Sequence, residues 1–117
     1  MAEAHRPVNV DPGLLTDAAN VMESAIAVRR RIHAHPEIGL ELPDTQELVV
    51  KELAALGLDG HTGRACSSVV AVIEGDSDGP TTLLRADMYA LEMPEDTGLD
   101  FASAIAGGMY ACGHDAH

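Results

Sequence analysis

The sequence predicts a fold that combines helices with a small sheet, of the α/β or α+β class, in the order helix, helix, strand, strand, loop. Two observations predict it. Apolar residues recur at helical spacing in the first half of the chain, and after Gly57 the pattern changes to runs rich in β-branched residues around a dense turn signal. Helices that precede an antiparallel strand pair are expected to cover one of its faces.

The first expected helix runs from about Leu14 to His35. Its arginines fall near the C-terminal end, where cations suit the helix dipole, and Pro36 ends it. The apolar residues at helical spacing, which are expected to face inward, are Leu15, Ala18, Ala19, Met22, Ile26 and Ile32.

A second helix is expected from Asp44 to Leu56. Asp44 or Thr45 would cap its start, because short polar side chains accept hydrogen bonds from the first free amides of a helix. Gly57 would end it. The residues expected to face inward are Leu48, Val49, Leu53 and Leu56.

Two segments after Gly57 are expected to be strands. They are residues 67–74 (SSVVAVIE) and residues 81–88 (TTLLRADM), and the turn signal GDSDGP between them predicts an antiparallel hairpin. Residues 89–108 contain glycines and a proline and are expected to form a long connecting loop, which in a compact domain is often functional.

Length and composition bound the function classes. The 117 residues suit one domain or part of one, with residues 1–13 as a flexible leader and residues 14–117 as the folded unit. The formal net charge of −12 argues against nucleic acid and anionic membranes as partners. The sequence contains no signal-peptide pattern and no long apolar run, and Cys66 and Cys112 are expected to be reduced thiols, so a cytoplasmic protein is expected; no pattern indicates an oligomeric state.

The chemistry-bearing residues gather in MYACGHDAH, residues 109–117. Cys112 and His114 lie two residues apart, and thiolate and imidazole are ligands that suit zinc and similar metals. Asp115, or Asp87 at the end of the second strand, could be a further ligand or could orient a ligating histidine. The spacing alone leaves a second interpretation open, in which the cysteine is a buried structural residue and the histidines lie on the surface.

Two more histidines, His33 and His35, lie in RRRIHAHPEIG at the end of the first expected helix. Histidine at a basic helix end is more often a capping or packing residue than a ligand. Both are therefore expected to have a structural role.

Three motifs together resemble the start of the amidohydrolase branch of the aminoacylase/carboxypeptidase metallopeptidase family. They are RRRIHAHPEIGLELPDT (29–45), LLRADMYALEMPEDTGLDFAS (83–103) and MYACGHDAH (109–117). This branch includes hippurate hydrolase and the indole-acetyl-amino-acid hydrolases. The resemblance extends from about residue 15 to residue 117, with the motifs in the family's order and at similar spacing.

The resemblance implies a zinc-peptidase-like α/β catalytic domain, of which residues 14–117 would be an incomplete, truncated N-terminal part. It implies hydrolysis of the amide bond of N-acyl amino acids or related small conjugates, with two divalent metal ions, manganese or zinc. Cys112 and His114 match the first two metal ligands of the family. Asp87, Asp115 and His117 match residues that support the site.

The same resemblance implies that this chain holds no catalytic residue, because the family's general-base glutamate and its remaining ligands follow the CGHD motif. At most partial metal binding is then expected. The alternatives are an inactive truncated remnant and a metal-binding module completed by a partner chain. The chain also departs from the family at Tyr89, Glu92 and Tyr110, where aspartate, proline and histidine are usual.

Overall fold

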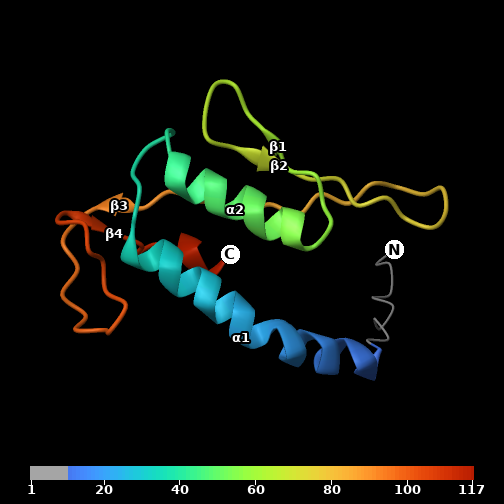
Figure 1. The fold of residues 1–117 in the computed structure, drawn as a ribbon, viewed down its shortest axis with the longest axis horizontal. Coiled ribbons are helices and arrows are strands. Elements are labelled where there is room, and N and C mark those ends of the chain that lie inside the picture. The colour runs from blue at the N-terminus through green and yellow to red at the C-terminus, as the bar shows by residue number, and fades with distance from the viewer. Residues whose placement is uncertain (1–10) are drawn as a thin grey trace, which may run out of the picture.

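The computed structural model describes residues 11–117, so most of the expected leader, residues 1–13, lies outside the described range. Two helices are followed by short antiparallel strand pairs, as the predicted fold class requires (Figure 1). The elements are α1 (Pro12–Ala34), α2 (Pro43–Ala55), β1 (His61–Thr62), β2 (Val69–Val70), β3 (Leu91–Glu92), β4 (Gly108–Met109) and the 3₁₀ helix η1 (His114–Ala116).

Helix α1 begins at Pro12, two residues before the predicted start. The side chain of Asp11 accepts a hydrogen bond from the backbone N–H of Gly13 at 2.8 Å, and Pro12 occupies the first turn, where its missing N–H costs nothing. Pro12 therefore starts the helix inside the segment that was expected to be part of the leader.

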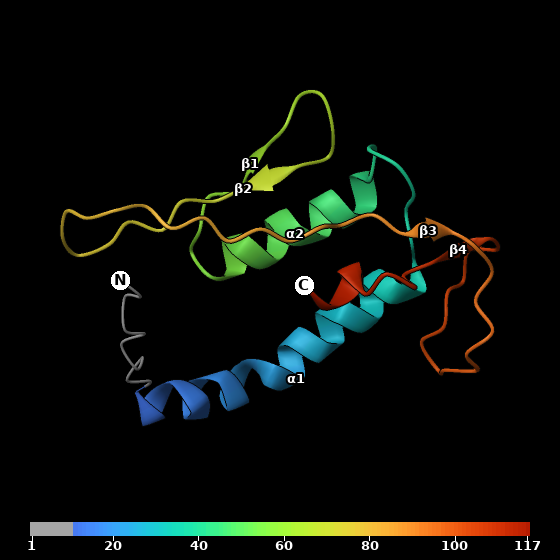
Figure 2. The ribbon, with the colours of Figure 1, turned by 180° about the vertical axis from the view of Figure 1, so that it is seen from behind.

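The predicted inward face of α1 is largely exposed. Leu15, Met22 and Ile26 all lie on the surface, and the buried residue of this helix is His33. Figures 1 and 2 give the reason, because the N-terminal half of α1 extends beyond the other described elements and only its C-terminal end meets them. Helical periodicity identified the helix correctly, but within residues 11–117 nothing covers its apolar stripe.

The start of α2 is capped from outside the helix. The backbone N–H groups of Thr45 and Asp44 donate hydrogen bonds to the carboxylate of Glu37, at 2.7 and 3.2 Å, and the N-cap residue Leu42 makes no side-chain bond. The predicted cap by the side chain of Asp44 or Thr45 was therefore wrong. A carboxylate at this position also suits the positive end of the helix dipole.

The end of α2 is as predicted. Gly57 has a positive φ of 76°, which a glycine adopts without steric cost. The N–H of Leu58 donates to the carbonyl of Leu53 at 3.0 Å, and the N–H of Gly57 donates to that of Ala54 at 3.0 Å. These two bonds form a Schellman motif, which satisfies the last carbonyls of the helix.

The predicted hairpin of residues 67–74 and 81–88 was wrong in its pairing. Only Val69–Val70 of the first segment is a strand, and it pairs with His61–Thr62, while residues 81–88 belong to neither strand pair. Strand propensity reflects packing on a half-buried surface. Leu83 and Leu84 are 85% and 91% exposed, so this segment lacks such a surface within the described residues.

The predicted loop 89–108 contains β3 near its start and reaches β4 at its end, and these two strands pair with each other. Its first residues form β3, which pairs with β4 in the antiparallel register Leu91↔Met109 and Glu92↔Gly108. Just before β3, Ala90 forms a parallel bridge with Ile38, and its N–H donates to the carbonyl of Glu37 at 2.8 Å. The linker between α1 and α2 is thus hydrogen-bonded to the segment that leads into β3.

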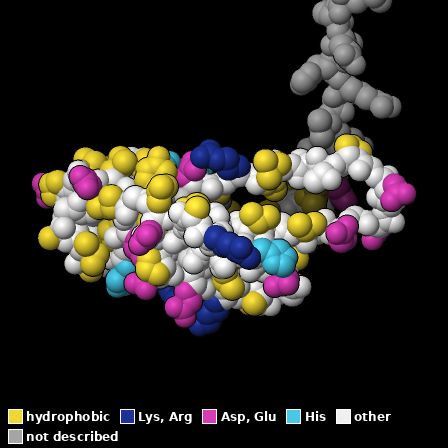
Figure 3. Space-filling view, turned by 90° about the horizontal axis from the view of Figure 1, so that it is seen from above, with side chains coloured by type: hydrophobic (Ala, Val, Ile, Leu, Met, Phe, Trp, Pro, Cys, Tyr) yellow, Lys and Arg dark blue, Asp and Glu magenta, His cyan; other side chains and the backbone are white. Residues whose placement is uncertain are grey.

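The core is small and partly polar. Its buried hydrophobic residues are Leu42, Leu48, Ala90 and Tyr110, and its buried polar residues are His33, Thr45 and Asp115. Apolar side chains also remain on the surface, where Figure 3 shows them dispersed among charged ones. In residues 11–117 no helix combines the length and the hydrophobicity that crossing a bilayer requires.

The external cap on α2 predicts the effect of Glu37→Ala. We expect a free energy of unfolding about 1–2 kcal/mol lower, because two helix-starting amides lose their acceptor. Glu41→Ala is the matched control, since Glu41 is an exposed acid in the same linker, and it should change stability by less than about 0.5 kcal/mol. Urea unfolding followed by circular dichroism measures both, and equal effects would contradict the assignment of the cap.

Candidate functional site

The two predicted ligands, Cys112 and His114, lie on a turn made by Gly113. Gly113 has φ +80°, and its N–H donates to the carbonyl of Tyr110 at 3.0 Å. A residue with a side chain would be strained there. The turn brings both ligands to one carbonyl oxygen, that of Tyr89, which lies 3.8 Å from the sulfur of Cys112 and 3.0 Å from Nδ1 of His114.

This contact determines which nitrogen of His114 is available. A carbonyl only accepts, so Nδ1 carries the proton and donates it to Tyr89. In the neutral imidazole Nε2 then keeps its lone pair, as in histidines that bind metal through one nitrogen and donate from the other. Nε2 faces Asp87, whose Oδ2 lies 3.7 Å away.

Asp87 and His117 complete the exposed side of this cluster. The backbone N–H of Asp87 donates to Nδ1 of His117 at 3.4 Å, and the ring centroids of His114 and His117 are 5.4 Å apart. Arg85 forms an ion pair with the other oxygen of Asp87. Thiol, imidazole and carboxylate thus occur in one neighbourhood, which is the donor chemistry that zinc and manganese accept.

The number of donors is smaller than a complete site needs. Within residues 11–117, no three histidine, cysteine or acidic side chains converge as metal ligands would. A catalytic zinc usually has three protein ligands. The residues present therefore fit part of a metal site, with Cys112 and His114 as its natural pair.

Asp115 points away from this cluster, into the protein. Its side chain is 1% exposed, and its Oδ2 accepts hydrogen bonds from Nε of Arg29 at 3.0 Å and from Nδ1 of His33 at 2.8 Å. Its Oδ1 is buried and has no hydrogen-bond partner. The 3₁₀ helix η1 is thereby held against the C-terminal end of α1, where Figures 1 and 2 show it.

His33 lies between two carboxylates. Opposite Asp115, its Nε2 contacts both oxygens of Glu95, at 3.1 and 3.2 Å. Both ring nitrogens thus face acceptors, which requires a proton on each. Burial alone would lower the pKa of His33, but the hydrogen bonds that it donates to Glu95 and Asp115 outweigh this effect and raise the pKa above its usual 6.5.

Glu95 is itself firmly held. The hydroxyl of Thr97 and the N–H of Ser103 donate to it, the latter at 2.6 Å, and together with His33 they lower the pKa of Glu95 to about 2. The ring of Phe101 meets the edge of His33, with centroids 5.3 Å apart. The loop 89–108 therefore contributes an anchor to this network, through Glu95.

Arg29 and Glu95 were not predicted as site residues, and His33 was expected only to cap or pack at a helix end. The expectation of a structural role for His33 is compatible with its burial, but its bridge between two distant carboxylates was not predicted. Its partners are 62 and 82 residues away in sequence, so spacing gives no signal. His35 is exposed, and its Nδ1 donates to the carbonyl of Arg31 at 3.3 Å, as expected of a residue at a helix end.

Both tyrosines that depart from the family pattern contact the site. The ring of Tyr89 lies edge-on to that of His114, with centroids 4.5 Å apart, while its carbonyl holds both ligands. Tyr110 is buried and donates its hydroxyl proton to the carbonyl of Met88 at 2.9 Å. Burial raises the pKa of the Tyr110 hydroxyl, so it stays a donor at neutral pH.

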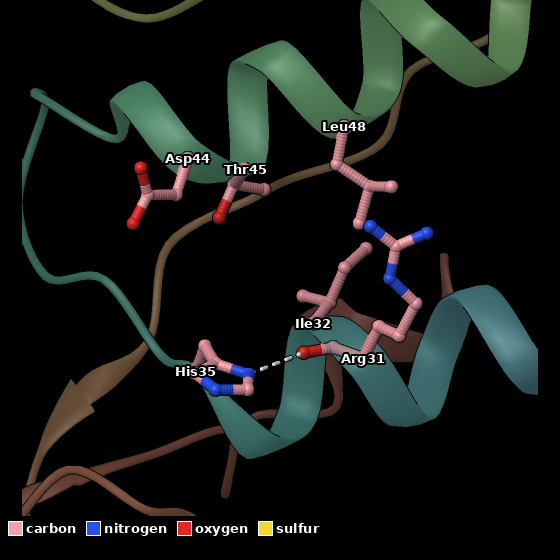
Figure 4. Close-up of a pocket in the computed structure, with 6 residues that line it drawn as sticks. All are labelled: Arg31, Ile32, His35, Asp44, Thr45 and Leu48. Atoms are coloured by element: carbon pink, nitrogen blue, oxygen red, sulfur yellow. Dashed lines mark hydrogen bonds between the residues drawn. The ribbon is translucent and has the colours of Figure 1, made fainter.

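A hollow of about 210 Å³ lies elsewhere, between the C-terminal part of α1 and the first turns of α2 (Figure 4). Its lining residues are Arg31, Ile32, His35, Asp44, Thr45 and Leu48. None of them is a predicted metal ligand or supporting residue, so the candidate site is the turn around Gly113 and not this hollow.

Comparison with known sequences finds close relatives. Thermostable carboxypeptidase 1 of Saccharolobus solfataricus is 40% identical over 105 residues, which are 89% of this chain and 27% of that protein. N-acetyl-L-cysteine deacetylase of Bacillus subtilis is 36% identical over 117 residues, which are 100% of this chain and 26% of that protein. No family model matches the sequence.

A solved structure agrees with the fold. The YxeP protein of Bacillus subtilis, described as a dinuclear metal-binding peptidase of the M20 family, superimposes with a TM-score of 0.79 at 35% identity. The match covers 85% of this chain and 28% of that one. This chain therefore spans about a quarter of the length of the relatives that it matches.

The charged network around His33 predicts how stability depends on pH. The lowered pKa of Glu95 contributes stability that is present above pH 4.5 and is lost as the pH falls towards 2. The raised pKa of His33 contributes stability that is complete below pH 6.5 and is lost as the pH rises through the folded-state value. We therefore expect the highest free energy of unfolding between about pH 4.5 and 6.5.

Urea unfolding at a series of pH values measures this profile. His33→Gln should flatten its alkaline side and Glu95→Gln its acidic side. His61→Gln is the control, because His61 is an exposed histidine outside the network. A profile of His33→Gln that falls on the alkaline side as steeply as that of the unmodified chain would disprove the assignment.

Proposed function

The chain is homologous to amidohydrolases and peptidases of the M20 family, as its motifs predict, and we propose that it supplies part of a metal site for amide hydrolysis. The substrate class is N-acyl amino acids or related small conjugates. One observation carries the proposal: Cys112 and His114 meet at the carbonyl of Tyr89, and Nε2 of His114 faces the carboxylate of Asp87. A relative that matches the whole chain is an N-acetyl-L-cysteine deacetylase.

The proposed ligands are Cys112 and His114, supported by Asp87, Asp115 and His117. In a complete site they would contribute to holding two divalent ions, manganese or zinc. Such ions supply Lewis acidity, which polarises an amide carbonyl and lowers the pKa of water. This role suits the thiol and imidazole donors of the turn.

The residues of this chain have defined tasks in that proposal. The carbonyl of Tyr89 orients His114 through Nδ1, and Asp87 lies beside Nε2, where a carboxylate favours cations. Asp115 holds the turn from inside the protein. Among residues 11–117 we assign no general base for the proton transfer that amide hydrolysis needs.

Two alternatives remain in the proposal. The chain could be an inactive remnant, or a metal-binding module that a partner chain completes. The exposed apolar side chains of α1 favour the second, because further polypeptide would bury them. Stoichiometric, tight metal uptake by the isolated chain would support the module, and weak uptake typical of any peptide with histidine and cysteine would support the remnant.

Cobalt(II) binding tests the ligand assignment. A Co²⁺ titration of the chain should produce a thiolate-to-cobalt charge-transfer band, since Cys112 is exposed on the candidate site. Cys112→Ser should abolish this band, and His114→Gln should weaken binding at least about tenfold. Cys66→Ser is the matched control, because Cys66 is the other free cysteine and lies on a different segment. A band that persists in Cys112→Ser would refute the assignment.

Activity is expected to be absent in the isolated 117 residues. Purified protein loaded with Mn²⁺ or Zn²⁺ should not release amino acid from N-acetyl amino acids above the rate of the metal alone. The physical reason is the shortage of ligands and the lack of an assigned general base. Amine release that depends on both the metal and Cys112 would overturn this expectation.

A further inference from the structure

We propose that His33 is a positioning residue of the candidate metal site, which as an imidazolium between Glu95 and Asp115 fixes the turn that carries Cys112 and His114. The effect of His33 on metal uptake rests on the proposed function. Its structural basis is independent of any metal, because it concerns contacts between described side chains.

The turn needs an external anchor. Three backbone hydrogen bonds hold it, from Gly113 to Tyr110 and from Ala116 to Gly113 at 3.0 Å each, and from His117 to His114 at 3.3 Å. A 3₁₀ helix of three residues has poor hydrogen-bond geometry and little stability of its own. Its placement therefore depends on side chains that reach it from other elements.

The external anchor of the turn acts on Asp115. It is the residue next to His114, and among the residues of η1 it alone is buried. Its Oδ2 accepts hydrogen bonds from Nδ1 of His33 at 2.8 Å and from Nε of Arg29 at 3.0 Å, and both residues lie in the last two turns of α1. His33 is buried, whereas the Arg29 side chain is 43% exposed, so the histidine is the more rigid of the two.

His33 is in turn fixed from its other side. Glu95 binds its Nε2 with both oxygens and is held by Ser103 and Thr97, so the ring cannot rotate without losing two carboxylate contacts. The edge of the ring packs on Phe101. Rigid support of this kind behind a ligand-bearing segment is what a metal site requires for correct geometry.

The charges around His33 explain why a neutral residue could not replace it. Two cations, His33 and Arg29, face two carboxylates, Asp115 and Glu95, and Asp115 already has one buried oxygen without a partner. A neutral side chain at position 33 removes the positive charge between the two carboxylates and leaves the buried Asp115 with the partly exposed Arg29 as its counter-charge, which is costly. Release of Asp115 towards solvent relieves that cost and moves the turn with it.

The test compares His33→Gln with His35→Gln, which removes an exposed histidine from the same helix end. Amide hydrogen exchange reports the turn without metal, through the N–H groups of Gly113 and Ala116. In His33→Gln their protection should fall by about tenfold or more while that of α2 stays within about twofold. Co²⁺ binding should weaken by about 10- to 100-fold. His35→Gln should change neither.

The outcomes separate the two proposals. Retained protection of Gly113 and Ala116 in His33→Gln overturns the positioning role, whatever the metal does. Absence of a thiolate–cobalt band in the unmodified chain defeats the proposed function, and hydrogen exchange still decides the positioning role. Unchanged cobalt affinity in His33→Gln, in a chain whose unmodified form binds cobalt through Cys112, also overturns it.

Two further measurements test the proposal if His33→Gln fails to fold. Glu95→Gln keeps the His33–Asp115 contact and removes only the negative charge of the outer anchor, so it should loosen the turn by a smaller factor; a turn as protected as before contradicts the proposal. In the unmodified chain, nitrogen-15 NMR at pH 6 should show two slowly exchanging ring N–H protons on His33. A neutral ring with one such proton would refute the imidazolium bridge.

Discussion

The contact between His33 and Asp115 is the constraint on which the arrangement of this chain depends. It joins the end of α1 to the turn near residue 115, and through Glu95 it also holds the loop 89–108. The apolar core is too small to do this, since among residues 11–117 it has four buried hydrophobic residues and no large side chain that is fully enclosed. In most domains burial of apolar surface fixes the fold and polar groups adapt to it. Here hydrogen bonds between charged groups determine where three segments meet.

Local signals in the sequence were sufficient for the C-terminal ends of the helices. Pro36 and Gly57 end them because a proline cannot continue a helix and a glycine adopts a positive φ, and both effects act within a few residues. The bridge at His33 was beyond such reasoning, because its partners lie 62 and 82 residues away and only the folded chain brings them together. The cap of α2 was missed for another reason: Glu37 is only 8 residues from Thr45, but its carboxylate reaches the helix through the path of the linker and not from the usual capping position.

The candidate site was predictable as a set of residues but not as a geometry. The CGHD motif indicated Cys112 and His114 as a pair of metal ligands. The oxygen that both side chains contact, the carbonyl of Tyr89, carries no side-chain signature, because a backbone oxygen is present at every position. Tyr89 also shows how a position can depart from a family pattern at its side chain and still serve the site through its backbone.

The extended segment 81–88 has a consequence for the behaviour of the protein at high concentration. Its leucines are exposed and its backbone belongs to neither strand pair of the described chain, which makes it a template for strand addition by another molecule. What opposes this in dilute salt is mutual repulsion between chains of net charge −12. Because ions screen that repulsion and leave the leucines unaffected, the colloidal stability of this protein is a function of ionic strength, with clustering favoured in concentrated salt.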